Sequence, residues 1–110
     1  MKIHLVKEKT IRNYVLNNPG SKIPFEEWLA KLKKTDWNKP ADVLGVFSFA
    51  DILGKGSNRV VFNIGGNNYR LISQYDFGTT EVHLFVCWIG THAEYDKLCA
   101  SGKQYSINVY

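Results

Sequence analysis

A histidine, a tyrosine and an aspartate near residue 92 have the types and spacing for acid–base chemistry. His92, Tyr95 and Asp96 stand at i, i+3 and i+4, so in a helix they lie on one flank. Thr91 and Glu94 match the S/T-x-x-E capping box, which predicts that the helix starts at His92, beside free backbone N–H groups. The positive end of a helix attracts anions and favours the neutral imidazole that a general base needs. The alternative is structural: His92 half-buried and Tyr95 packed in the core.

A second group of polar residues lies in NRVVFNIGGNNYRLIS (58–73), where two apolar runs flank a Gly-Gly turn typical of a β-hairpin. Because side chains alternate between the faces of a strand, Arg59, Asn63 and Arg70 can share the more polar face. Lys55 lies just upstream, in a glycine-rich loop that could swing over this face. A guanidinium makes paired hydrogen bonds to phosphate oxygens, so the face is a candidate for contact with a phosphate backbone. Alternation alone favours the other interpretation, an ordinary solvated face with scattered cations.

The elements that would position these residues are an antiparallel meander and a closing helix. The capping box predicts a helix over 91–100, and ADILGKGSN (50–58) is typical of a loop. KQYSINVY (103–110) fits either a last strand or a loose tail. Alternating apolar runs between the turns GGNN and DFGTT predict three strands, near 59–64, 69–75 and 81–89.

The sequence of residues 2–47 predicts mainly helices. KIHLV (2–6) suits a short strand, and residues 7–18 a helix with a narrow apolar stripe. PFEEWLAKLKK (24–34) is the clearest helix, since its apolar residues recur at i, i+3, i+4 and i+7 and Pro24 suits a first helical position. KPADVLGVF (39–47) suits one short helical turn. We therefore expect an α+β fold, with an N-terminal helical pair packed on an antiparallel three- to four-stranded sheet and a C-terminal helix.

The composition is that of one folded domain, residues 1–110, with 45% apolar and 14% aromatic residues. A formal charge of +4 permits a polyanionic partner without requiring one. No long apolar run is present, so we expect neither a signal peptide nor a membrane span. His83, Cys87 and His92 fit no metal-ligand spacing, and we expect no metal and no cofactor. Cys87 and Cys99 suit reduced thiols in the cytoplasm better than a disulfide.

The hairpin RVVFNIGGNNYRLI, the apolar strand after it and the helix start THAEYDKL, in this order, resemble HigB-type toxins of bacterial toxin–antitoxin modules. The resemblance implies a RelE-like ribonuclease fold and a metal-independent mRNA endoribonuclease (mRNA interferase), often acting on ribosome-bound message. It also implies a HigA-type antitoxin partner with a helix-turn-helix DNA-binding domain, and a complex that represses its own promoter.

The resemblance also assigns roles to single residues. Arg70 would stabilise the scissile phosphate, His92 and Tyr95 would share the acid–base work, and Asp96 would support them. The residues assigned to RNA binding are Asn63 and three that match only as basic residues, Lys55, Arg59 and Lys97. Two other functions stay open from the residues alone: a non-catalytic RNA-binding module that uses the same basic face, or a protein-interaction domain that meets an acidic partner.

Overall fold

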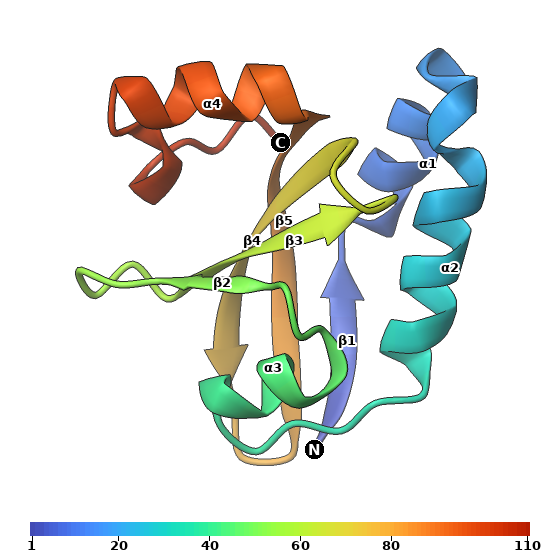
Figure 1. The fold of residues 1–110 in the computed structure, drawn as a ribbon. Helices are drawn as coiled ribbons and strands as arrows, with labels where there is room; N and C mark the ends of the chain where they lie inside the picture. The colour runs from blue at the N-terminus through green and yellow to red at the C-terminus, as the bar shows by residue number, and fades with distance from the viewer.

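The computed structural model describes all 110 residues and packs four helices around one sheet (Figure 1). Short 3-10 turns lie at Pro19–Ser21, Pro40–Asp42 and Lys103–Tyr105. In chain order the main elements are β1 (Lys2–Val6), α1 (Glu8–Asn17), α2 (Lys22–Lys33), α3 (Val43–Val46), β2 (Asp51–Leu53), β3 (Arg59–Ile64), β4 (Tyr69–Phe77), β5 (Glu81–Thr91) and α4 (His92–Ala100). The predicted α+β class is confirmed.

The sheet has five strands in the order β1-β5-β4-β3-β2, and β1 runs parallel to β5. The predicted antiparallel sheet of three to four strands is therefore wrong in its strand number and in the direction of β1. The missing strand is β2, which pairs with Arg59–Val61 in the stretch predicted as a loop. Strand β2 could not be recognised in the sequence because it has only three residues and glycine-rich sequence follows it directly.

The helices follow the predicted apolar stripes with small shifts. Helix α2 begins at Lys22, so Pro24 occupies its third position and not its first. Pro24 fits there because the first-turn N–H groups have no partner within a helix. Helix α4 begins at His92 with Thr91 as its N-cap, as the capping box predicts. The last residues form no strand. The C-terminal segment, residues 101–110, is irregular apart from the 3-10 turn Lys103–Tyr105.

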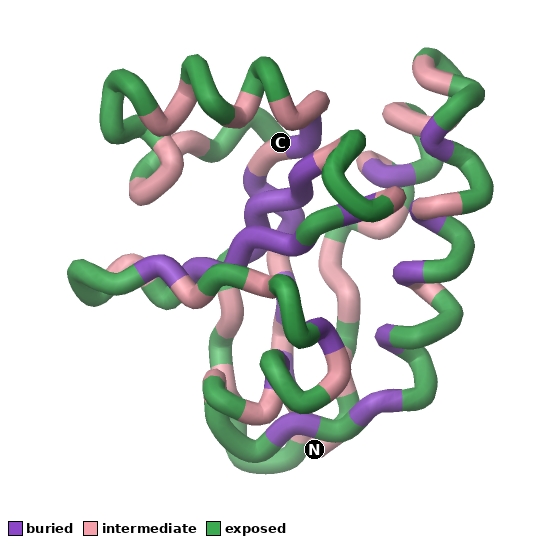
Figure 2. Tube along the Cα trace, in the orientation of Figure 1, coloured by how far each residue is buried: buried purple, intermediate pink, exposed green.

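The two faces of the sheet are covered unequally. Helices α1, α2 and α3 cover the inner face over a cluster of 15 buried side chains that includes Phe25, Trp37 and Phe62. On the outer face, α4 and the C-terminal segment cover only four, namely Leu53, Val61, Ile72 and Cys87. Figure 1 shows α4 on the opposite side of the sheet from α1 and α2, and Figure 2 shows the buried residues concentrated in the strands between them.

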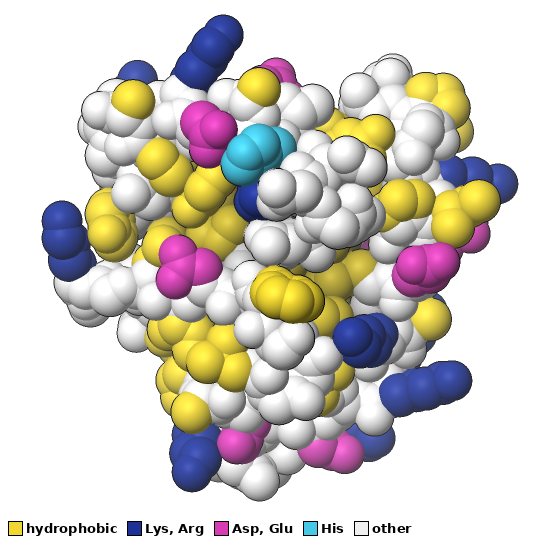
Figure 3. All heavy atoms as spheres, viewed as in Figure 1, with side chains coloured by type: hydrophobic (Ala, Val, Ile, Leu, Met, Phe, Trp, Pro, Cys, Tyr) yellow, Lys and Arg dark blue, Asp and Glu magenta, His cyan; other side chains and the backbone are white.

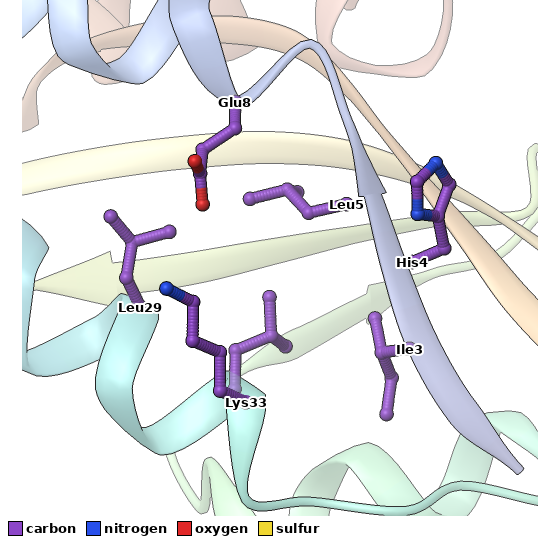
Figure 4. Close-up of a pocket in the computed structure, with 7 residues that line it drawn as sticks. Ile3, His4, Leu5, Glu8, Leu29 and Lys33 are labelled. Atoms are coloured by element: carbon purple, nitrogen blue, oxygen red, sulfur yellow. The ribbon is translucent and has the colours of Figure 1, made fainter.

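A hollow of about 220 Å³ lies between β1 and α2. Figure 4 shows Ile3, Leu5 and Leu29 around it, with Glu8 and Lys33 pointing toward it, whereas the ring of His4 lies on the far side of β1. None of the residues with predicted acid–base or phosphate chemistry lines this hollow. No helix has the length and apolar character needed to cross a membrane.

Candidate active site

Arg70 is the centre of a polar cluster built by three elements. It lies at the start of β4, on the outer face, and is only 7% exposed. Its Nη2 donates to Asn67 Oδ1 at 2.6 Å and contacts His92 Nδ1 at 2.9 Å, while Nη1 donates to the Tyr69 carbonyl at 3.0 Å. The β3–β4 turn, β4 and α4 therefore meet at one guanidinium. The structure thus brings Arg70 and His92 into contact.

The contact with Arg70 favours one tautomer of a neutral His92 ring. A guanidinium only donates hydrogen bonds, so in the neutral ring Nδ1 would accept from Arg70 and Nε2 would carry the proton. Nε2 lies 3.4 Å from Asp96 Oδ2, and the His92 side chain is 45% exposed. The imidazole thus connects a buried cation to a solvent-accessible carboxylate, with its N–H at the accessible end.

The helix start supports His92 without offering many free donors. The His92 N–H donates to the Asn68 carbonyl at 3.0 Å. Thr91 N donates to Glu94 Oε1 at 2.8 Å, and Glu94 N donates to Thr91 Oγ1 at 3.2 Å. The expectation of free N–H groups beside His92 is therefore largely wrong, because cap and turn already use three of them. Arg70 is left as the main group for binding an anion here.

Tyr95 packs as a wall of the site. Its ring centroid lies 6.0 Å from Arg70 Cζ and 6.2 Å from the ring of Trp88. Burial raises the pKa of the Tyr95 hydroxyl, and the adjacent Cys99 raises it further. The hydroxyl therefore stays protonated at neutral pH. This favours a packing or hydrogen-bond-donor role for Tyr95 over that of a base.

Gly90 leaves room for the ring of Trp88, which packs against Tyr95. It pairs with Arg70 across the β4–β5 ladder. A Cβ added at Gly90 would lie 2.4 Å from Cη2 of the Trp88 ring, so a side chain there would displace the indole.

Three of the four residues predicted to bind RNA are exposed. Asn63 is exposed and lies opposite Arg70 in the β3–β4 register, so the two share the outer face. Lys55 is exposed in the β2–β3 loop, with Nζ 4.6 Å from the ring centroid of Tyr105. Lys97 is exposed on α4, five residues after His92 and so on another side of the helix.

Arg59 is in a different situation, since it is 5% exposed and faces the C-terminal segment. Its Nη1 donates to the carbonyls of Ile107 at 2.6 Å and Gln104 at 3.2 Å. These contacts anchor the segment over the sheet, so the structure gives Arg59 an occupied, structural place. Alternation could not reveal this, because the partner lies 45 to 48 residues further along the chain.

Asn67 is the site residue that the sequence reasoning missed. It stands in the Gly-Gly-Asn-Asn turn that served only as a hairpin signal. The turn folds its side chain back onto Arg70, three residues later. A polar residue in a hairpin turn, close in sequence to a buried arginine, is the signal that could have identified it. No group of three or more His, Cys, Asp or Glu side chains gathers in an arrangement that could hold a metal ion.

Comparisons with known proteins find relatives in one family of toxins. A model of the HigB toxin family, described as the RelE-like toxic component of a toxin–antitoxin system, matches residues 21–98. The mRNA interferase HigB of Escherichia coli O6:H1 (strain CFT073) is 27% identical over 96 residues, which are 87% of this chain and 91% of that protein. The mRNA interferase toxin HigB of Escherichia coli strain K12 is 26% identical over 98 residues, 89% of this chain and 92% of that protein. The matched family segment contains Arg70, Asn67 and His92.

Proposed function

The chain belongs to the HigB family, the RelE-like toxic components of toxin–antitoxin systems, and we propose that it is a metal-independent endoribonuclease that cleaves mRNA. The relatives named mRNA interferase support this activity. One structural observation supports it independently: the buried Arg70 guanidinium lies at hydrogen-bonding distance from the His92 ring, whose other nitrogen faces solvent.

The chemistry of RNA cleavage fits these groups. Attack of the 2′-OH on the adjacent phosphate requires removal of a proton, stabilisation of the extra negative charge and protonation of the 5′-oxygen that leaves. Arg70 has five N–H groups, of which Nε–H and one on Nη1 are left for a phosphate. His92 can give a proton from Nε2 to the leaving 5′-oxygen only as an imidazolium, because loss of Nε2–H from the neutral ring would leave an imidazolate. We therefore assign it the charged form at that step, with Arg70 Nη2 turned from Nδ1 toward the phosphate and Asp96 beside Nε2 stabilising the added charge.

The family also defines the partners that we propose. A toxin of a toxin–antitoxin system has a neutralising antitoxin, and we assign this role to a HigA-type protein with a helix-turn-helix domain. The substrate is mRNA, engaged on the ribosome, which places the action in the cytoplasm. Asn63 lies beside Arg70 and is the predicted RNA-binding residue nearest to the proposed reaction.

The proposal is tested by expressing the chain with and without its antitoxin and by assaying purified protein on mRNA. We expect growth arrest that the antitoxin relieves, and cleavage that His92→Ala reduces by about 100-fold, the typical contribution of a general acid or base. The matched control is His4→Ala, an exposed histidine on β1. Soluble protein that neither arrests growth nor cuts mRNA, with or without ribosomes, would contradict the proposed activity. Tight RNA binding without cleavage would indicate a non-catalytic RNA-binding module instead.

A further inference from the structure

A hollow lies along the edge of the sheet next to the proposed active site. Strand β2 pairs only with Arg59–Val61, so the rest of β3, Phe62–Ile64, has no neighbouring strand on that side. The loop between α3 and β2 runs past this free edge. Between them lies a hollow of about 240 Å³.

The residues around this hollow combine an aromatic ring, an amide and a cation. Phe49 stands at its rim with 82% of its surface exposed, the most exposed of the large apolar side chains. Asn63 lines the hollow from β3, and Lys31 lines it from α2. Lys31 Nζ lies 5.2 Å from the ring centroid of Phe47, which forms part of the floor. Figure 3 shows hydrophobic side chains exposed on the same face of the molecule as a histidine and several Lys or Arg side chains.

The hollow is continuous with the surroundings of Arg70 through two residues. Asn63 is the direct cross-strand neighbour of Arg70, and such neighbours on one face have Cβ atoms about 5 Å apart. Gly66 lines the hollow and belongs to the same turn as Asn67, which holds the Arg70 guanidinium. The backbone of Arg70 is thus one strand spacing, about 5 Å, from Asn63 at the edge of the hollow. Phe47 and Phe62 line the hollow on the inner-face side of that edge and the Arg70 side chain lies on the outer-face side, so an RNA bound at both would pass around the edge of the sheet.

We propose that this hollow is a nucleobase subsite: the base next to the scissile phosphate stacks on Phe49, with Asn63 at its polar edge and Lys31 beside its phosphate or sugar. Unpaired bases are held in proteins by stacking on aromatic side chains together with hydrogen bonds to their edges. The inference rests on the proposed function, since it takes Arg70 as the site of the reacting phosphate. It adds to that function a residue, Phe49, that lies outside the acid–base cluster and would influence which nucleotide is presented for cleavage.

The mixture of groups favours RNA over a segment of the antitoxin as the occupant. A peptide anchored by apolar side chains needs a desolvated pocket, whereas Phe49 stands at the rim of an open hollow that an amide and an ammonium also line. The exposed ring of Phe49, beside the Asn63 amide and the Lys31 ammonium, suits a nucleotide, whose base is planar with polar edges and is attached to a phosphate. An antitoxin contact remains an outcome that the experiment identifies.

The test combines protein variants with RNA from which one base is removed. The cleavage site of a short RNA is first mapped with the parent protein, with ribosomes if cleavage requires them. Versions of this RNA, each abasic at one position beside the cut, are then assayed with the parent, Phe49→Ala and Phe49→Tyr. The control is Leu16→Ala, which truncates another exposed apolar side chain, 78% exposed and located on α1.

For the parent, we expect one abasic position to lower kcat/KM by roughly five- to hundredfold, the range that one base–aromatic stack contributes. Phe49→Ala should cause a similar loss on intact RNA, and removal of that base should then cause little further loss. Phe49→Tyr should keep most of the activity, and Leu16→Ala should match the parent. Such non-additivity is the signature of direct contact.

Two results would overturn the subsite. One is cleavage of intact RNA by Phe49→Ala at the parental rate; the other is a loss from Phe49→Ala that simply multiplies with the loss from every abasic position. Unchanged cleavage combined with weaker neutralisation by the antitoxin would assign Phe49 to the protein partner. Failure of the proposed function would appear in the parent itself, as absence of any cleavage, and is thus distinguishable from failure of the subsite.

Discussion

Two arginines on the outer face of the sheet, Arg59 and Arg70, are almost equally buried, at 5% and 7% exposure, but their partners differ in kind. Arg59 donates to main-chain carbonyls of the C-terminal segment. Arg70 bonds two side chains, Asn67 and His92, besides the carbonyl of its neighbour Tyr69. Side chains can exchange one partner for another by rotation, whereas carbonyls of a packed segment stay in place. One guanidinium therefore anchors the C-terminal segment, and the other is the one that we propose as the binding group for the phosphate.

Replacement of Arg70 tests the catalytic half of this comparison and has the largest expected effect. Arg70→Ala should lower the rate of mRNA cleavage by about 100-fold or more, because it removes the charge that would stabilise the developing negative charge on the phosphate. Circular dichroism and thermal unfolding should show a folded protein. The control is Arg12→Ala on α1, an exposed arginine that bonds only Glu8. Parental cleavage by folded Arg70→Ala would show that the site has been assigned to the wrong cation.

Replacement of Arg59 should have the opposite effect, a loss of stability with cleavage kept. Arg59→Ala leaves the part-buried carbonyls of Gln104 and Ile107 without their partner, which should lower the free energy of unfolding by about 1–3 kcal/mol. Denaturant unfolding measures this change, and cleavage per folded molecule at low temperature should stay near the parental value. If Arg59→Ala instead loses cleavage and keeps its stability, Arg59 binds RNA, as the resemblance implies.

Asn67 tests whether the orientation of Arg70 matters beyond its charge. Asn67→Ala removes the 2.6 Å contact that fixes the guanidinium and should lower kcat by about tenfold, since small misplacements of catalytic groups slow reactions strongly. Asn67→Asp keeps an acceptor oxygen and should recover part of the rate. Asn68→Ala is the control, because Asn68 contributes its main-chain carbonyl. An equal loss in both alanine variants would indicate a general disturbance of the turn.

The smallest effect is expected for the hydroxyl of Tyr95. Tyr95→Phe should retain cleavage within about twofold if the ring packs against Trp88 and Arg70 and the hydroxyl takes no part in proton transfer. Burial raises the pKa of Tyr95, so the tyrosine stabilises the folded state below its ordinary pKa, near 10, and this contribution is lost as the pH rises toward its folded-state value. Tyr95→Phe should therefore unfold less readily than the parent above about pH 10. A strong loss of cleavage would instead restore Tyr95 to the acid–base chemistry.

The sequence predicted best the parts of the site that local rules determine. The capping box of Thr91 and Glu94 located His92, and the hairpin around Gly65 and Gly66 brought Arg70 toward it. Both signals operate within a few residues and depend little on the rest of the chain.

The misses all concern partners distant in sequence. The place of Arg59 depends on a segment that returns 45 or more residues later. The parallel direction of β1 depends on pairing with Glu81–Phe85, at the other end of the chain. Strand β2 is recognisable only through its pairing with β3, because three residues are too few to show an alternating pattern. Local pattern therefore located the candidate groups Arg70 and His92, and long-range packing decided which of the cations remain exposed.

The position of β5 in the sheet has a consequence for how the protein is made. β5 is the last strand in the chain but lies between the first strand, β1, and β4. On a translating ribosome, β1 therefore has no neighbour until residues 81–91 have emerged, and pairing across such a separation is slow compared with formation of the helices. His92 follows β5 directly, so it reaches Arg70 only after β5 has joined the sheet. The order of synthesis thus delays assembly of the candidate site until β5 and the start of α4 have been made.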